Sequence, residues 1–297
     1  MSGPVPVNPN GGRRHVDDGR RSVLVAVAST VVFFAVVGWI VVTSPGWPEI
    51  RRSFLDIEIF WDTLGDAAPA FVTRNVVLAL AAEALILVLA LVVAILRSLP
   101  GPVFAPLRLL ATVYVDLFRA VPGIVVIFAL GFGAPTLDIP WLPVDEFFWA
   151  VVTLTLLYSA YVSEVYRAGI DSVHPSQEAA ARSLGLTRWQ AMRFVILPQA
   201  VRRVIPPLLN DFIGLQKDTV LVSFIGVIEV FRTAQIKQAA TFNFTPYVAV
   251  TLIFLVVTIP MARFVDWLIA RERDKRYAAL VRADAKAARR GRIWGFR

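Results

Sequence analysis

Long apolar runs recur along this chain, and they decide what it can fold into. The first covers residues 22–43, and as a helix it would extend roughly 33 Å, which is enough to cross the hydrocarbon core of a bilayer. No small-x-small cleavage pattern follows it, so we expect a retained transmembrane helix and not a signal peptide. With hydrophobic residues at 57% of the composition, the sequence predicts an all-α integral membrane protein.

About six segments of this kind are expected to cross the membrane. They lie near residues 22–43, 72–96, 107–132, 147–170, 199–226 and 247–270. The fifth contains Pro206 and Pro207, which predict a break or kink there. Irregular backbone at that depth has to be covered by protein or by a water-filled cavity.

The segments outside these spans differ in composition. Residues 1–21 are rich in Gly, Pro, Asn and Arg without apolar periodicity, which predicts a disordered arm. Residues 44–70 mix aromatic and acidic side chains, which is typical of an extracytoplasmic interfacial segment. We expect the main helical core at 71–270 and a basic tail at 271–297.

The distribution of charge predicts the orientation. The net charge is +8, and residues 271–297 alone hold ten Arg or Lys against three acids. Beside a hydrophobic helix, such a tail favours a cytoplasmic flank near anionic lipid over a nucleic-acid-binding tail. With six crossings, both termini and the loop at 171–198 would lie in the cytoplasm of a multi-pass cell-membrane protein.

Residues 176–198 form a polar, helix-forming segment between two apolar parts of the chain. The local sequence predicts two short helices joined at Gly185, where a residue without a side chain can turn the backbone. Ser176 is expected to cap the first helix, and Thr187 and Gln190 have the spacing of a capping box for the second. The proline that closes the segment would interrupt the hydrogen-bond pattern.

This segment resembles the EAA loop of ABC-importer permeases, EAA-x3-G-x9-I-x-LP, in the form used by polar amino-acid permeases. Gly185, Val195, Leu197 and Pro198 fall on the expected spacing. The stretches 114–123, 158–173 and 210–219 also look like this family, so the resemblance covers about 71–271. It implies a five-helix permease core, with the helix at 22–43 as an addition.

The resemblance implies that residues 176–198 couple the chain to a separate ATPase. In this chain the glutamate position of the motif holds Ala179, and the acid stands one residue earlier at Glu178. The residues expected at the ATPase contact are Glu178, Ala179, Ala180, Gly185, Arg188, Leu197 and Pro198. The alternative is a solvated amphipathic loop that lies on lipid headgroups.

Ionisable side chains at membrane depth are candidates for the substrate path, because each costs on the order of 3 kcal/mol there. Arg119 and Glu164, on neighbouring spans, would grip the carboxylate and ammonium of a zwitterion. Lys217, Asp218 and Thr219 come late in the fifth span, where polar groups beside irregular backbone suit a gate. The alternative is that these groups pair with each other and serve only the structure.

Several absences limit the chemistry. The chain has no cysteine and no G-x-x-x-x-G-K-[ST] phosphate loop, and nothing in it indicates a catalytic triad or a metal site. We therefore expect a transport subunit that is not an enzyme, with ATP and Mg bound by a partner. The resemblance implies ABC ATPase subunits, a second permease chain of the same or a related kind, and an extracytoplasmic substrate-binding protein.

The leading hypothesis is the permease subunit of an importer for polar amino acids, of the glutamate or glutamine type or related compounds. A secondary transporter without an ATPase partner is the alternative, and it would call for inverted repeats. A membrane-anchored regulator that uses the basic tail on nucleic acid would need little polarity within the spans, contrary to Glu83, Arg119 and Glu164.

Overall fold

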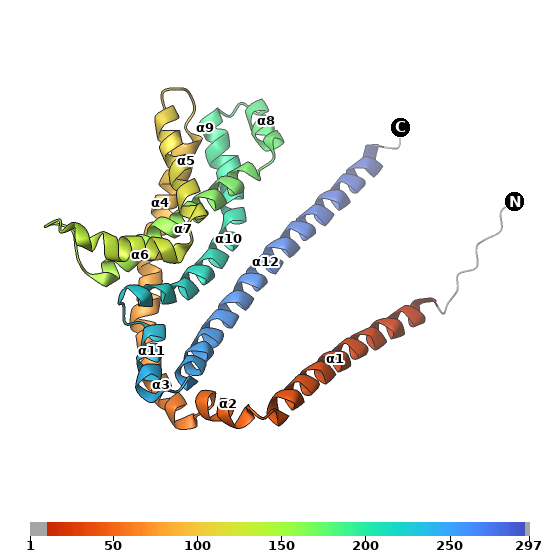
Figure 1. Ribbon diagram of the computed structural model, residues 1–297. Coiled ribbons are helices and arrows are strands. Elements are labelled where there is room, and N and C mark those ends of the chain that lie inside the picture. The colour runs from red at the N-terminus through yellow and green to blue at the C-terminus, as the bar shows by residue number, and fades with distance from the viewer. Residues whose placement is uncertain (1–10, 295–297) are drawn as a thin grey trace. The chain divides into compact units, whose positions relative to one another are not determined.

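The computed structural model describes the backbone of residues 11–294, and within that range every regular element is helical (Figure 1). The prediction of an all-α protein is confirmed. The chain divides into two compact units, which comprise residues 11–56 and 57–294 of the described range. Four of the described helices are long and apolar enough to cross a membrane alone, or up to six if each of two bent pairs counts as one span.

The first unit consists of α1 (Gly11–Thr43) and the short α2 (Trp47–Phe54). The apolar part of α1, Val23–Thr43, matches the first expected span. Residues 11–21, which we expected to be disordered, continue the same helix, because each residue added to an existing helix adds one hydrogen bond. The rest of the expected arm, residues 1–10, lies outside the described residues.

The second unit begins with a continuous helical run of α3 (Ile57–Ala70), η1 (Phe71–Val76) and α4 (Val77–Ser98), in which η1 is a turn of π-helix. The expected span at 72–96 lies inside this run. The segment 44–70 is not one separate piece, because α3 belongs to the compact core. Ala67 and Phe71 are buried against Val230 and Val250 from later helices.

The expected third span, 107–132, is not a straight helix. It consists of α5 (Ala105–Ala120) and α6 (Gly123–Gly133), which are bent by 107° with respect to each other, followed by the 3₁₀ turn η2 (Pro135–Leu137). Val121 has an extended backbone, with φ −90° and ψ 133°. Pro122 causes this, because proline lacks an amide hydrogen and disfavours helical backbone in the residue before it.

The central helix of the second unit is α7 (Glu146–Asp171), which packs against α4, α5, α6 and α10. It is long and apolar enough to be the expected span. The main core lies along it and combines Leu154 with Ile86 of α4, Ile127 of α6 and Leu215 of α10, all of them buried.

The fifth expected span contains α10 (Leu197–Asp218), the 3₁₀ helix η4 (Thr219–Ile225) and α11 (Val230–Thr241). The expected break at Pro206 and Pro207 is wrong, since α10 continues through both prolines. The break comes later, between Gly226 and Glu229, with a bend of 49°. Gly226 has φ +105°, a conformation that other residues rarely adopt.

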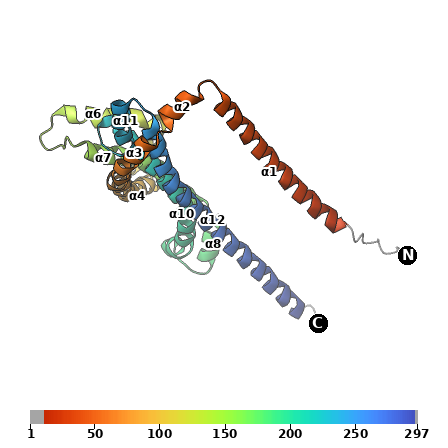
Figure 2. The same ribbon diagram turned by 90° about the horizontal axis from the view of Figure 1, so that it is seen from below.

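The last helix, α12 (Thr245–Trp294), includes the expected sixth span and most of the basic tail. Its first half packs against α3, α10 and α11. Figures 1 and 2 both show its second half extending beyond the other helices of this unit. The final residues of the tail, 295–297, lie outside the described range.

The contact between α7 and α10 provides a test of this packing. A Cβ atom at Gly169 would lie 2.0 Å from Cγ2 of Val204. We therefore expect Gly169→Ala to lower the free energy of unfolding by about 1–3 kcal/mol, measured by denaturant titration in detergent. The matched control is Gly65→Ala, a helical glycine with nothing within 4 Å of the added Cβ. Equal stability of the two variants would contradict the close approach.

Candidate functional site

A cavity of about 280 Å³ lies between α7, α10 and the start of α6, and we call it the α7–α10 cavity. Helix α7 contributes Leu157, Tyr158 and Tyr161, while Gly123 begins α6. From α10 come the polar side chains Asn210, Asp211 and Asp218, together with Gly214. Most of the lining is therefore polar or aromatic, although the surrounding helices are apolar.

The acids of the cavity have different partners. The hydroxyl of Tyr158 donates a hydrogen bond to Oδ2 of Asp218 at 2.8 Å. Oδ2 of Asp211 is shielded from solvent and has no hydrogen-bond partner. Glu83 of α4 is close enough to Asp211 for their charges to interact. Of the two cavity acids, Asp218 therefore has a hydrogen-bond donor, whereas Oδ2 of Asp211 is left without one among the described residues.

An ion cluster lies next to the cavity. Glu164 of α7 pairs with Arg97, at the end of α4, and lies 3.8 Å from Arg119, at the end of α5. The guanidinium of Arg119 also lies 5.9 Å from the ring centroid of Tyr161, which lines the cavity. The structure therefore pairs Arg119 with Glu164 and adds Arg97, which is the arrangement expected under the alternative that these groups pair with each other.

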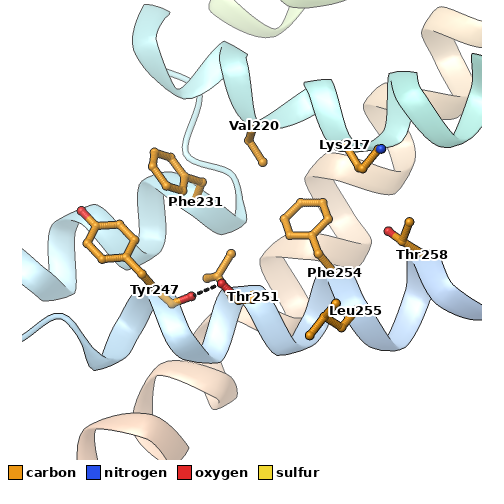
Figure 3. A pocket seen from close by; sticks show the side chains of 9 residues that line it. Lys217, Val220, Phe231, Tyr247, Thr251, Phe254, Leu255 and Thr258 are labelled. Atoms are coloured by element: carbon orange, nitrogen blue, oxygen red, sulfur yellow. Dashed lines mark hydrogen bonds between the residues drawn. The ribbon is translucent and has the colours of Figure 1, made fainter. Parts of the chain in front are cut away.

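The structure separates Lys217, Asp218 and Thr219, which the sequence presented as one group. Successive helical residues point about 100° apart, so three neighbours cannot line one cavity. Asp218 faces the α7–α10 cavity, whereas Lys217 lines a second cavity of about 340 Å³ between α10, η4, α11 and α12 (Figure 3). That second cavity is mostly apolar, with residues such as Val220 and Phe254 around the lysine.

Thr219 faces a buried polar network that sequence reasoning missed. The amide of Asn75 donates hydrogen bonds to Oγ1 of Thr219 at 2.9 Å and to Oε2 of Glu229 at 2.8 Å. The carboxylate of Glu229 also accepts from the backbone amides of Phe231 and Arg232, at the start of α11. Asn75, Thr219 and Glu229 are all fully buried. Two features of the sequence could have indicated this network: Asn75 is a lone asparagine in an apolar run, and Glu229 is an acid just before the start of a helix.

The segment 176–198 contains the two short helices that were predicted. These are α8 (Pro175–Ser183) and α9 (Arg188–Ala191), with Gly185 between them at φ +87°. The capping box is confirmed, because the amide of Gln190 donates to Oγ1 of Thr187 at 3.2 Å, and the amide of Thr187 donates to Oε1 of Gln190 at 2.9 Å.

The cap expected at Ser176 is wrong. The α8 helix begins two residues earlier than a cap at Ser176 implies, at Pro175, a position that suits the fixed φ of proline. The cap is His174, whose Nδ1 accepts a hydrogen bond from the amide of Ser176 at 3.2 Å. The closing Pro198 changes the hydrogen-bond pattern but does not end the helix. A π-helical turn, η3 (Met192–Ile196), leads directly into α10.

The α8–α9 segment has one face buried and one face exposed. Ala181 and Ala191 pack inward, while Glu178 lies 3.8 Å from Arg188 across the turn. Ala179 and Ala180 are exposed. The exposed face also carries large apolar side chains, namely Leu184 at 85%, Trp189 at 70% and Phe194 at 63% exposure. An exposed apolar patch of this kind, with small residues and arginines beside it, is typical of a protein-docking surface.

The fold and the site together define a class, a helical membrane protein with a cavity that polar side chains line between its spans and an exposed apolar patch on a connecting segment. Residues 86–274 match the family of binding-protein-dependent transport system inner membrane components. The match covers more than half of the chain, and the chain therefore belongs to this family.

Individual relatives agree with this assignment. The chain is 39% identical to the probable glutamine ABC transporter permease protein GlnM of Bacillus subtilis (strain 168), over 62% of this chain and 83% of the relative. It is 35% identical to the probable amino-acid permease protein YxeN of the same organism, over 74% and 98%. A crystal structure of an amino acid ABC transporter with histidines matches with a TM-score of 0.63 and 32% identity, over 69% of this chain and 94% of that one.

The buried network provides a prediction. Replacing Asn75 by Leu removes the amide that Glu229 and Thr219 accept from, and leaves the amide of Val230 without its acceptor. We expect a loss of about 3 kcal/mol in the free energy of unfolding, because buried groups lose their partners. Thermal unfolding in detergent would measure it, with Thr73→Val, at an exposed position of the same helical turn, as the control. If both variants unfold alike, the network does not hold these helices.

Proposed function

We propose that this chain is the transmembrane permease subunit of an ATP-driven ABC importer that carries polar amino acids across the cell membrane. The observation that carries the proposal is the α7–α10 cavity, where polar side chains of α10 face an open volume inside a bundle of apolar helices. The names of the relatives, which are amino-acid and glutamine permeases, support the substrate class. The chain would perform no covalent chemistry.

The partners follow from the family. ATPase subunits that bind ATP and Mg would dock on the cytoplasmic side, and an extracytoplasmic binding protein would deliver the substrate. A second permease chain, identical or related, would complete the path. In this arrangement both termini are cytoplasmic, which agrees with the basic residues at the end of α12.

The α8–α9 segment would be the contact with the ATPase. Its exposed Ala179 and Ala180 permit close approach, and Leu184, Trp189 and Phe194 offer apolar surface to a groove. Binding of ATP would pull the segments of two permease chains together and change the access of the path from one side to the other. Leu197 and Pro198, at the start of α10, would transmit this movement to the helix that lines the cavity.

The substrate path would pass the α7–α10 cavity. Arg119 and the backbone amides at the start of α6 would attract the carboxylate of an amino acid, because that helix end is positive. Asp218 would attract its ammonium group. Glu164, which is already paired with two arginines, would position Arg119 and not bind the substrate itself.

Docking is tested by a charge on the exposed face. We expect Trp189→Glu to reduce the amount of ATPase that co-purifies with the permease by at least about tenfold, since a buried charge without a partner opposes association. Trp141→Glu is the control, because Trp141 is 79% exposed in the loop after η2. A normal amount of ATPase with Trp189→Glu would argue that the segment rests on lipid.

Coupling is tested at the turn. Gly185 has a left-handed backbone with open space around it, so a β-branched residue acts there through backbone strain and not through a clash. We expect Gly185→Val to abolish uptake and the stimulation of ATPase activity while the complex still assembles. Gly185→Asn should retain most activity, because asparagine tolerates this conformation. Equal uptake by both variants would show that coupling does not depend on the backbone conformation of this turn.

A further inference from the structure

The charges around the α7–α10 cavity are unbalanced. Asp211 and Asp218 line it from α10, and Glu83 lies close enough to Asp211 to interact with it. In the part of the chain whose side chains are described, none of these three acids has a Lys or Arg nitrogen within 4 Å. Lys217 does not balance them, because it lines the other cavity (Figure 3).

Among the described residues, two positive groups lie beside this cavity, Arg119 and the amino end of α6. The guanidinium of Arg119 lies beside the ring of Tyr161, which lines the cavity, and also pairs with Glu164. The amino end of α6 borders the cavity as well, since Gly123 lines it and none of the described side chains caps this helix. The cavity therefore has one positive end, which suits one carboxylate, and a face with more acids than a single ammonium group can neutralise.

The remaining lining also suits a cation. The rings of Tyr158 and Tyr161 lie 6.4 Å apart between centroids, and both line the cavity. Aromatic faces attract guanidinium and ammonium groups. Asp211 lines the cavity, and its shielded Oδ2 has no hydrogen-bond partner among the described residues, so the described side chains leave this carboxylate uncompensated. A guanidinium presents several N–H donors in a geometry that matches a carboxylate.

We infer that the substrate of this permease is an amino acid whose side chain carries a positive charge, a guanidinium or an ammonium group. This inference rests on the proposed function. The α-carboxylate lies toward Arg119 and the start of α6, and the two cationic groups neutralise Asp218 and Asp211. An amino acid with a neutral side chain leaves one acid unpaired, and one with an acidic side chain adds a like charge beside both.

The test measures binding by the permease, so that the selectivity of a separate binding protein does not decide the result. The intact complex with its ATPase subunits is reconstituted in lipid nanodiscs, and radiolabelled L-arginine is bound at equilibrium. We expect unlabelled L-arginine and L-lysine to compete at concentrations at least about tenfold lower than L-glutamine, with no competition by L-glutamate.

Substitutions place the recognition in the cavity. Asp211→Asn and Asp218→Asn should each weaken arginine binding by about tenfold or more, with a much smaller change for glutamine. Asp116→Asn, at an exposed position of α5 outside the cavity lining, is the control for loss of an acid within a span. Thermal unfolding of each complex checks that it is folded, and the competition series on the unmodified complex needs no variant.

The outcomes separate this inference from the proposed function. If the complex contains its ATPase and binds glutamine or glutamate more tightly than arginine, the inference is overturned and the importer remains. Undiminished arginine binding in both aspartate variants overturns it as well. If no ATPase co-purifies and no amino acid binds, the proposed function fails and the inference fails with it.

Discussion

The second unit depends on the carboxylate of Glu229, which is completely buried and satisfied by three N–H donors. One is the side-chain amide of Asn75, and two are backbone amides of the first turn of α11. A buried carboxylate without such donors would be very costly, so each contact is required. Asn75 lies in the π-helical turn between α3 and α4, and it also donates a hydrogen bond to Thr219. The carboxylate of Glu229 and Asn75 together therefore connect the first long helical run of the unit to the break in the fifth span.

The hydrogen bonds of Asn75 with Thr219 and Glu229 determine which way α10 faces. Thr219 is the first residue after α10, and its contact with Asn75 sets the rotation of the helix end. With Thr219 turned toward Asn75, Asp218 faces α7, where it meets Tyr158, and Lys217 faces α12 (Figure 3). The acidic character of the α7–α10 cavity is therefore a consequence of packing elsewhere. A rotation of α10 by about 100° would replace an acid with a lysine at the cavity wall.

Local sequence predicted several local features, although it placed the α8 cap at Ser176 and the structure has it at His174. The capping box at Thr187 and the turn at Gly185 are correct because both depend on residues within one or two turns. Features set by distant contacts were missed or misplaced. The prolines at 206 and 207 indicated a break, yet the break occurs at Gly226, where Glu229 caps the next helix. Likewise, the network between Asn75 and Glu229 joins residues 154 positions apart, and no local pattern reports such a pair.

The position of the α8–α9 segment explains how a force on it would reach the cavity. The segment connects the end of α7 to the start of α10, and these two helices also form the cavity walls. Near the segment they are held closely: Gly169 packs directly on Val204, and Arg203 donates hydrogen bonds to Ser172 at the end of α7. Farther along, the contact of Tyr158 with Asp218 is a single hydrogen bond beside an open volume. Packed interiors transmit strain, whereas an open cavity does not resist it. A displacement of the segment would therefore change the distance between α7 and α10 at the cavity, next to Tyr158 and Asp218.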